Sequence, residues 1–234
     1  MTAPLHGGII AAGEGRRLRA GGFAMPKPLV PVAGVPLIES TVRNFEAAGV
    51  ASLVIIVNDE GRRCIEWVRE RFPRLDVDFI VKTTASSLES FREVNRRMPG
   101  GRALVSTVDT WCAPSAFAAF TGAARARSED ATVLAVTALV EDEAPLWVDA
   151  TPDGRVRSVG AGPTPLITAG VYVFSPSARS APAPASLGRL RDFLGWLVRT
   201  GEPVYAETIG SVVDVDRASD VALAESFARA GGAS

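Results

Sequence analysis

Cysteine and histidine are scarce in this sequence. The chain of 234 residues has two cysteines, Cys64 and Cys112, and one histidine, His6. Two cysteines so far apart form neither a disulfide framework nor a metal site of the usual spacing, so we expect a reducing compartment. His6 precedes the first expected strand and is not a candidate catalytic group.

An excess of charge and a long apolar run are also missing. Lys plus Arg number 25 and Asp plus Glu number 26, so the overall charge gives no indication of binding to nucleic acid or to an anionic membrane. No apolar stretch approaches the roughly 20 residues of a transmembrane helix. The first apolar run is short and lacks the basic lead of a signal peptide. We therefore expect a cytoplasmic protein that binds neither nucleic acid nor membrane.

Short apolar runs alternate with helical patterns along the chain. Apolar residues make up 47% and charged residues 22%, which is ordinary for a globular domain. Strands that alternate with helices indicate βαβ units and a mainly parallel sheet, so we predict an α/β fold. The expected strands are 9–12, 52–57, 77–81, 103–108, 131–139, 146–150, 155–159, 168–174 and 204–208. The expected helices are 36–48, 62–71, 86–97, 114–127, 187–200 and 221–229.

A strand, a glycine turn and a group of basic residues follow one another near the amino terminus. The turn contains Gly13 and Gly15, and the basic residues after it are Arg16, Arg17, Arg19 and Lys27. Glycines let the backbone approach a ligand closely, and free N–H groups in such a turn bind anions. Arginine adds a planar fork for phosphate oxygens and lysine adds a point charge. The segment therefore predicts a triphosphate-binding site.

This two-part motif resembles the signature of the nucleotidyltransferase superfamily. That group includes sugar-1-phosphate nucleotidylyltransferases, phosphocholine cytidylyltransferases and molybdenum-cofactor-type transferases. The family pattern is a strand ending Ala-Gly, a turn Gly-x-Gly-Thr-Arg-Leu, and then Pro-Lys-Pro-Leu. Here residues 12–18 read AGEGRRL and residues 26–29 read PKPL. Arg17 and Lys27 fall on the family's arginine and lysine, whereas Arg16 stands where Thr or Ser is usual.

Other glycine-rich motifs fit less well. A dinucleotide fingerprint requires a third glycine at the start of a helix, but Arg16, Arg17 and Leu18 occupy that place. A Walker A loop requires Gly-Lys followed by Ser or Thr, which is absent from this turn. A basic turn in contact only with solvent is the remaining alternative.

The resemblance implies a Rossmann-like three-layer α/β/α sandwich with a mostly parallel central sheet. It implies a single domain over residues 1–234, with a nucleotide-binding half of about 1–130 and an acceptor-binding half of about 131–234. It gives catalytic roles to Arg17, which would hold the departing β- and γ-phosphates, and to Lys27, which would contact the α-phosphate and the incoming phosphate. The implied nucleotide-binding residues are Ala11, Ala12, Gly13, Glu14, Gly15, Arg16, Ser86 and Ser87.

Ser86 and Ser87 also have a purely structural interpretation. Ser86 and Glu89 have the spacing of a capping box, which would start the helix that runs to about Arg97. In the family, a polar or glycine-rich segment at this place contacts the base or the sugar. The two interpretations are compatible.

Asp109 follows the expected strand 103–108 directly. Magnesium prefers one or two carboxylates together with phosphate oxygens and water. The position resembles the family's metal-binding aspartate, so we predict that Asp109 binds Mg²⁺. The alternative is an N-cap for the helix expected at 114–127.

The segment 212–220 resembles the family's closing segment. Some branches use the residue at Asp214 as the second metal ligand and others use the one at Asp216. This chain has both, and Asp214 ranks slightly ahead. Asp220 is interpreted as an acidic residue in the first turn of the last helix.

Residues 168–174 resemble a family segment that lines the acceptor pocket. Thr168 replaces the usual Asn, while Gly170 and Tyr172 fit the pattern. The resemblance implies that Thr168 and Gly170 bind the acceptor. Gly170 either allows a close approach of the acceptor or marks a strand bulge.

Three further segments complete the expectations. Residues 175–185 are rich in Pro, Ser and Ala, which predicts a surface loop and a candidate lid. The acidic residues 141–143 are interpreted as a solvated turn rather than a metal site. Trp196 is a candidate contact in a homodimer.

The implied reaction moves an NMP group from an NTP to a small phosphorylated acceptor, such as a sugar-1-phosphate or phosphocholine, with Mg²⁺ as cofactor. Two alternatives remain open. A glycosyltransferase of the same fold would use Asp214 and Asp216 as its metal motif, but it has no use for Lys27. A non-catalytic nucleotide sensor would bind NTP without turnover, and the intact Arg17 and Lys27 argue against it.

Overall fold

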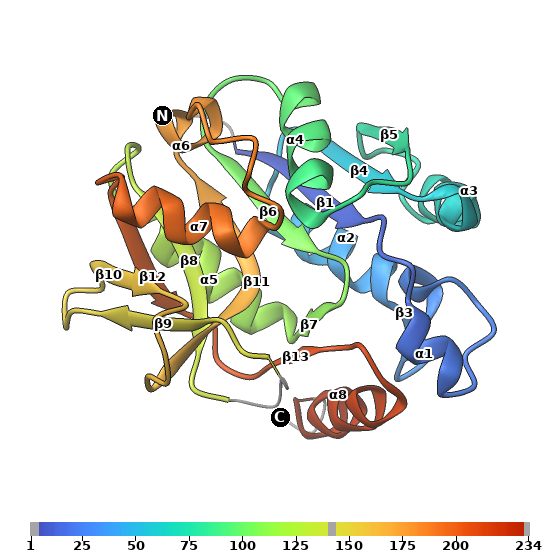
Figure 1. Ribbon diagram of the computed structural model, residues 1–234. Helices are drawn as coiled ribbons and strands as arrows, with labels where there is room; N and C mark the ends of the chain where they lie inside the picture. The colour runs from blue at the N-terminus through green and yellow to red at the C-terminus, as the bar shows by residue number, and fades with distance from the viewer. Residues whose placement is uncertain (1–4, 140–143, 232–234) are drawn as a thin grey trace.

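Strands from distant parts of the chain pair in one sheet, which places the glycine turn and Asp109 at the same edge. The computed structural model describes residues 5–139 and 144–231. Among these residues, the sheet has nine strands in the order β10-β9-β11-β6-β1-β4-β5, with β8 paired to β11 and β12 (Figure 1). These nine are β1 His6–Ala11, β4 Leu53–Val57, β5 Val77–Val81, β6 Ala103–Thr107, β8 Thr132–Thr137, β9 Trp147–Ala150, β10 Val156–Val159, β11 Leu166–Phe174 and β12 Val204–Thr208.

Two small antiparallel pairs and the helices complete the chain. The pairs are β2 Pro31–Val32 with β3 Val35–Pro36, and β7 Thr110–Cys112 with β13 Val212–Asp214. The helices are α1 Arg16–Ala20, α2 Leu37–Ala47, α3 Arg62–Arg71, α4 Ser87–Arg97, α5 Pro114–Ala126, α6 Pro176–Ser180, α7 Leu190–Arg199 and α8 Ala218–Gly231. Two 3-10 turns, η1 Lys27–Leu29 and η2 Asp59–Gly61, lie between them.

The predicted parallel sheet is confirmed in the first half of the chain. β1 pairs in parallel with β4 and with β6, and β4 pairs in parallel with β5. β11 pairs antiparallel with β6, β8 and β9 in the second half of the chain. The carboxyl ends of β1, β4 and β6 therefore meet at one edge, where ligands of such sheets bind.

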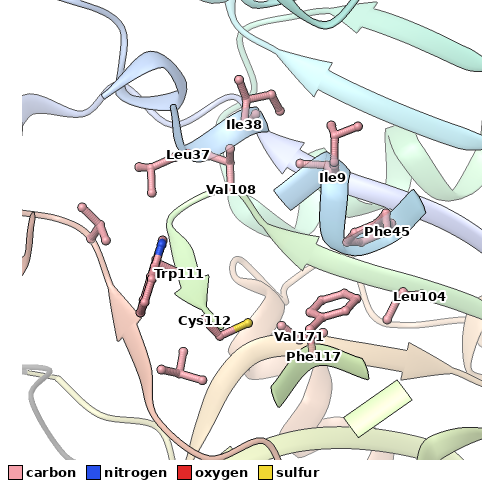
Figure 2. Close-up of a cluster of buried hydrophobic side chains, with 14 of the residues drawn as sticks. Ile9, Leu37, Ile38, Phe45, Leu104, Val108, Trp111, Cys112, Phe117 and Val171 are labelled. Atoms are coloured by element: carbon pink, nitrogen blue, oxygen red, sulfur yellow. The ribbon is translucent and has the colours of Figure 1, made fainter. Parts of the chain in front are cut away.

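Alternate residues of β1 enter two different hydrophobic clusters. Ile9 packs with α2, α3, α5 and α8, whereas Ile10 packs with α4, α6 and α7. This alternation is the period of two that a strand buried on both faces requires. Figure 2 shows part of the first cluster, in which the rings of Phe45 and Phe117 lie 5.5 Å apart. The predicted three-layer α/β/α arrangement is thus confirmed.

The helix expected at 187–200 is present as α7, and it buries one apolar side. Leu190, Phe193, Leu194 and Leu197 of α7 are all buried against the sheet. Trp196 is half-buried and stacks on Phe193 with ring centroids 5.9 Å apart. A dimer contact at Trp196 stays a prediction.

The expectation of a loop over 175–185 is wrong for its first part. Residues 176–180 form α6, which Ser175 caps by accepting a hydrogen bond from the Ala178 N–H at 3.0 Å. Arg179 donates to the carbonyls of Pro99 and Gly101 at 2.7 and 2.6 Å, so its guanidinium fixes α6 to the loop that follows α4. A lid role for residues 175–185 stays a prediction. The acidic residues 141–143 lie outside the described residues.

The described part of the chain contains no helix with both the length and the apolar composition needed to cross a membrane.

Both cysteines are free thiols inside the first cluster. Cys64 lies in α3 and Cys112 in β7, and burial raises the pKa of each thiol to about 12. Since the thiolate is the reactive form, a raised pKa removes reactivity at about pH 8. We expect both thiols to react with a colorimetric disulfide reagent more than about a thousandfold more slowly in the folded protein than in concentrated guanidinium chloride. Rapid modification of either thiol in the folded protein would contradict this burial.

Candidate active site

A buried lysine ammonium lies between two carboxylates at the carboxyl edge of the sheet. Lys27, the first residue of η1, is only 7% exposed. Its Nζ donates to Asp109 Oδ2 at 2.6 Å and also to Asp216 Oδ1. Burial alone would lower the pKa of Lys27, but the carboxylates of Asp109, Asp216 and Asp214 outweigh it and hold that pKa above its ordinary value.

Asp109 occupies the turn between β6 and β7. Burial would raise the pKa of this carboxyl, but the Lys27 ammonium overrides it and holds the pKa below its usual range. Val108 and Trp111 on either side are 3% and 8% exposed and are drawn in Figure 2, so the turn is anchored at both ends. The N-cap alternative for Asp109 is wrong, because β7 intervenes and Ala113 is the N-cap of α5.

Backbone hydrogen bonds bring the closing segment to Asp109. β13 pairs with β7 so that Asp214 stands opposite Thr110, and the Val215 N–H donates to the Asp109 carbonyl at 3.0 Å. Val215 is fully buried, which leaves Asp214 exposed and Asp216 half-buried on either side of it.

Asp109, Asp214 and Asp216 together form an acidic cluster. One carboxylate oxygen of each lies within 4.8 Å of the others. Three carboxylates at this spacing are a donor set that suits Mg²⁺. The structure thus brings together all three predicted metal ligands, and their role as ligands stays a prediction.

Gly15 joins the two halves of the sequence motif. It has a φ of 62°, which favours glycine, and it precedes α1. A Cβ at this position would lie 2.7 Å from Lys27 Cβ. Gly15 is therefore required both for the backbone turn and for the close packing of the turn on Lys27.

The other residues of the glycine turn form its open side. Ala11 and Ala12 are buried, while Gly13 and Glu14 are exposed, and a Cβ at Gly13 would meet no atom within 4 Å. The Asn58 side chain donates to the carbonyls of Ala12 and Gly13, both at 3.3 Å. Asn58 was not among the predicted site residues, although it directly follows the expected strand 52–57 and lies beside the end of β1.

The two arginines after the turn point to different partners. Arg17 Nη1 donates to Asp216 Oδ2 at 2.9 Å, so this guanidinium reaches the acidic cluster. Arg16 pairs instead with Glu14. Arg17 is about half exposed, which leaves donors of its planar fork for a further anion.

Ser86 and Ser87 lie at the start of α4. The Ser86 hydroxyl accepts from the Glu89 N–H at 3.2 Å, and the Glu89 carboxylate accepts from the Ala85 N–H at 2.7 Å. These contacts confirm the helix cap. Ser87 accepts from the Leu190 N–H at 3.1 Å and lines the cavity described next, whereas a contact of either serine with a nucleotide stays a prediction.

A cavity of about 210 Å³ lies beside the acidic cluster. Asp109 and Asp214 line it, as do both predicted acceptor residues, Thr168 and Gly170. Tyr172, also in its wall, has a hydroxyl that bonds the Thr168 side chain, and burial raises the pKa of this hydroxyl to about 12. The cavity therefore offers neutral hydrogen-bonding groups next to the carboxylates.

Gly170 is both a bulge and a point of close approach. The pairing of β11 with β8 shifts between Thr168 and Tyr172, and Gly170 has a φ of 73°. A Cβ here would lie 2.1 Å from Thr110 Oγ1 and 2.9 Å from Thr107 Oγ1, which hydrogen-bond each other at 2.8 Å. The bulge interpretation is confirmed, and binding of an acceptor here stays a prediction.

The sequence interpretation missed two groups besides Asn58. Arg189 and Arg191, which line the cavity, were assigned only to the helix expected at 187–200. Their signal is weak, because a surface arginine before an apolar stripe is common in any helix.

Comparison with known proteins identifies relatives over most of the chain. A family model described as "MobA-like NTP transferase domain" matches residues 7–194. The bifunctional IPC transferase and DIPP synthase of Rubrobacter xylanophilus is 28% identical over 236 residues, which cover 93% of this chain and 50% of that protein. The CMP-5'-(3-aminopropyl)phosphonate synthase of Streptomyces rubellomurinus is 28% identical over 93 residues, covering 40% of this chain and 15% of that protein. The chain thus spans half or less of each of these two relatives.

Solved structures show the same fold. The inositol-1-phosphate CTP transferase from T. maritima superposes with a TM-score of 0.77 over 94% of this chain and 93% of that one. The two sequences are 20% identical, so this likeness concerns the fold alone.

The close packing around Gly170 predicts that a larger residue there lowers the stability of the fold. Gly49 has a similar φ of 67°, but a Cβ there would meet no atom within 4 Å. Gly49→Ala should therefore lower the free energy of unfolding by about 1–2 kcal/mol, the cost of a left-handed alanine. Gly170→Ala should lower it by about 1–3 kcal/mol more, because the new methyl group must also displace Thr110. Urea denaturation of both variants measures the difference, and equal losses would show that the approach to Thr110 is not tight.

Proposed function

The chain belongs to the MobA-like NTP transferase family and is a nucleotidyltransferase, and we propose the following reaction for it. The proposed reaction is Mg²⁺-dependent transfer of an NMP group from an NTP to a small phosphorylated acceptor, with release of pyrophosphate. The observation that supports it most is the buried Lys27 ammonium, which lies between Asp109 and Asp216 beside the glycine turn. An anion site, a cation site and a cavity thus meet at one edge of the sheet.

In this proposal an oxygen of the acceptor phosphate attacks the α-phosphorus of the NTP. The new bond joins that oxygen to the α-phosphorus, and the bond from the α-phosphorus to the bridging oxygen breaks. Pyrophosphate leaves with the electron pair. The acceptor phosphate is already ionised near neutral pH, so no general base is required. Catalysis then depends on positioning and on charge neutralisation.

The residues divide these tasks by position. Lys27 contacts the α-phosphate and the incoming phosphate, because its ammonium bonds Asp109, which lines the cavity, and its side chain packs on Gly15 of the glycine turn. Arg17 holds the β- and γ-phosphates that depart, since its guanidinium is about half exposed and also reaches Asp216. Asp109 with Asp214 or Asp216 would hold Mg²⁺, which when bound neutralises charge on the triphosphate oxygens.

The nucleotide is proposed to be CTP. Two similar proteins carry CMP or CTP in their names. The backbone of Ala11, Ala12 and Gly13 is proposed to contact the base, with Glu14, Gly15 and Arg16 along the phosphates and Ser86 and Ser87 opposite them. Asn58 would support this contact indirectly, because it fixes the carbonyls of Ala12 and Gly13.

A thermal-shift panel tests the nucleotide and the metal together. The protein is heated with ATP, CTP, GTP or UTP, each with and without Mg²⁺. We expect CTP with Mg²⁺ to raise the melting temperature most, because a ligand at about one hundred times its Kd stabilises a fold by roughly 2.7 kcal/mol. A shift that is equal for all four nucleotides, or that does not need Mg²⁺, would contradict this part of the proposal.

Replacing the central ammonium tests the catalytic role. Lys27→Gln should lower the rate of pyrophosphate release at least about a hundredfold, because the developing charge at the α-phosphate loses its nearest cation. Arg97→Gln is the control. Arg97 also pairs with a carboxylate, that of Asp78 at 2.9 Å. This pair is exposed, however, and lies far from the glycine turn in the sequence. Far-UV circular dichroism confirms that both variants fold. Full activity of the folded Lys27 variant would rule out the assigned role.

A further inference from the structure

Two arginines line the same cavity as the acidic cluster. Arg189 immediately precedes α7 and Arg191 lies in its first turn, and both line the cavity together with Asp109 and Asp214. The proposed reaction requires cations near the triphosphate, where Lys27 and Arg17 lie. Arg189 and Arg191 have no role in that reaction as proposed above.

The arginines and the carboxylates come to the cavity from different elements. Arg189 and Arg191 lie at the start of α7, whose Leu190 is buried in the cluster with α4 and α6. Asp109 lies in the turn between β6 and β7, and Asp214 is the last residue of β13. A molecule that fills the cavity therefore meets both carboxylates and guanidinium groups.

Arg191 donates one hydrogen bond to the protein backbone. Its Nη2 donates to the Ala144 carbonyl at 3.1 Å, which leaves its other N–H groups available for a ligand. Arg189 and Arg191 line the same cavity as Asp109 and Asp214. The opposite charges therefore act within the same small space.

Neither guanidinium has a carboxylate partner within 4 Å among residues 5–139 and 144–231. An arginine fork that lines a cavity without such a partner suits a carboxylate or phosphate oxygen of a ligand. The reacting phosphate of the acceptor must lie near Lys27, where the NTP α-phosphate is expected. Lys27 is not among the residues that line the cavity, whereas both arginines are, so an anion bound by the arginines would be a second one.

We propose that the acceptor carries a second anionic group, a carboxylate or a further phosphoryl group, and that Arg189 and Arg191 bind it. This inference rests on the proposed function, because it takes the cavity to be the acceptor site. It favours acceptors with an anionic tail over neutral polyol phosphates. It disfavours acceptors with a cationic tail, phosphocholine among them, since like charges would meet in a confined space.

Three small phosphates with different tails provide the test. 3-Phosphoglycerate has a carboxylate where glycerol 3-phosphate has a neutral hydroxymethyl group, and phosphocholine has a quaternary ammonium. Each is titrated into the protein by calorimetry with Mg²⁺, both without nucleotide and with α,β-methylene-CTP, which cannot transfer its CMP group. We expect 3-phosphoglycerate to bind at least about tenfold more tightly than glycerol 3-phosphate, and phosphocholine to bind most weakly.

Variants of the arginines show whether they cause the preference. In Arg189→Gln/Arg191→Gln, the dissociation constant of glycerol 3-phosphate divided by that of 3-phosphoglycerate should fall toward one. In Arg191→Glu, the affinity for phosphocholine should rise relative to the affinity for 3-phosphoglycerate. Arg199→Gln, at the exposed carboxyl end of the same helix, should keep the wild-type ratio. A preference for glycerol 3-phosphate or phosphocholine, equal binding or no binding of the three, or an unchanged ratio in the double variant would overturn the inference.

Failure of the proposed function would be seen separately. If 3-phosphoglycerate binds as expected but no NTP yields pyrophosphate in its presence, the arginine site stands and the transfer reaction falls. If pyrophosphate is released with a neutral acceptor and the anionic tail gives no advantage, the reaction stands and the second anion site falls.

Discussion

The ion pairs of the buried Lys27 ammonium with Asp109 and Asp216 are the interaction on which the site depends. Removing a charged group from water costs several kcal/mol unless partners of good geometry replace the water. The structure meets this requirement with elements far apart in sequence, since Lys27 and Asp216 are 189 residues apart. The pairing of β7 with β13, the hydrogen bond from Val215 to Asp109 and the absence of a side chain at Gly15 all serve to keep these groups together.

The same arrangement explains how three carboxylates can stay close together before a substrate arrives. Asp109, Asp214 and Asp216 would repel one another in the absence of cations, and Lys27 and Arg17 offset that repulsion. In the proposed function, a triphosphate with Mg²⁺ brings both negative and positive charge to the site. The phosphates would then pair with Lys27 and Arg17, and the Mg²⁺ with the carboxylates. The fold thus sets the positions of these charges before the substrate binds.

Local patterns predicted most of the fold, and a two-part motif predicted much of the candidate site. The alternation of apolar runs located the main strands and helices, because each buried strand and each amphipathic helix has its own period. The N-cap at Ser86 and the apolar stripe of α7 could also be predicted from neighbouring residues alone. The start of α6 has a local signal that the sequence interpretation did not use, namely Ser175 as N-cap followed by Pro176. The contacts that fix α6, from Arg179 to distant carbonyls, could not be predicted locally. Asn58, Arg189 and Arg191 were missed because strand pairing and helix packing across the sheet, not local sequence, bring them to the site.

A crystal structure of the protein with CTP and Mn²⁺, with anomalous scattering used to locate the metal, would test the central claim most directly. The account predicts a metal peak between Asp109 and either Asp214 or Asp216. It also predicts that Lys27 Nζ has exchanged a carboxylate contact for an oxygen of the α-phosphate. A metal bound elsewhere, or a nucleotide whose phosphates lie away from Lys27 while its ion pairs with Asp109 and Asp216 stay intact, would contradict the account.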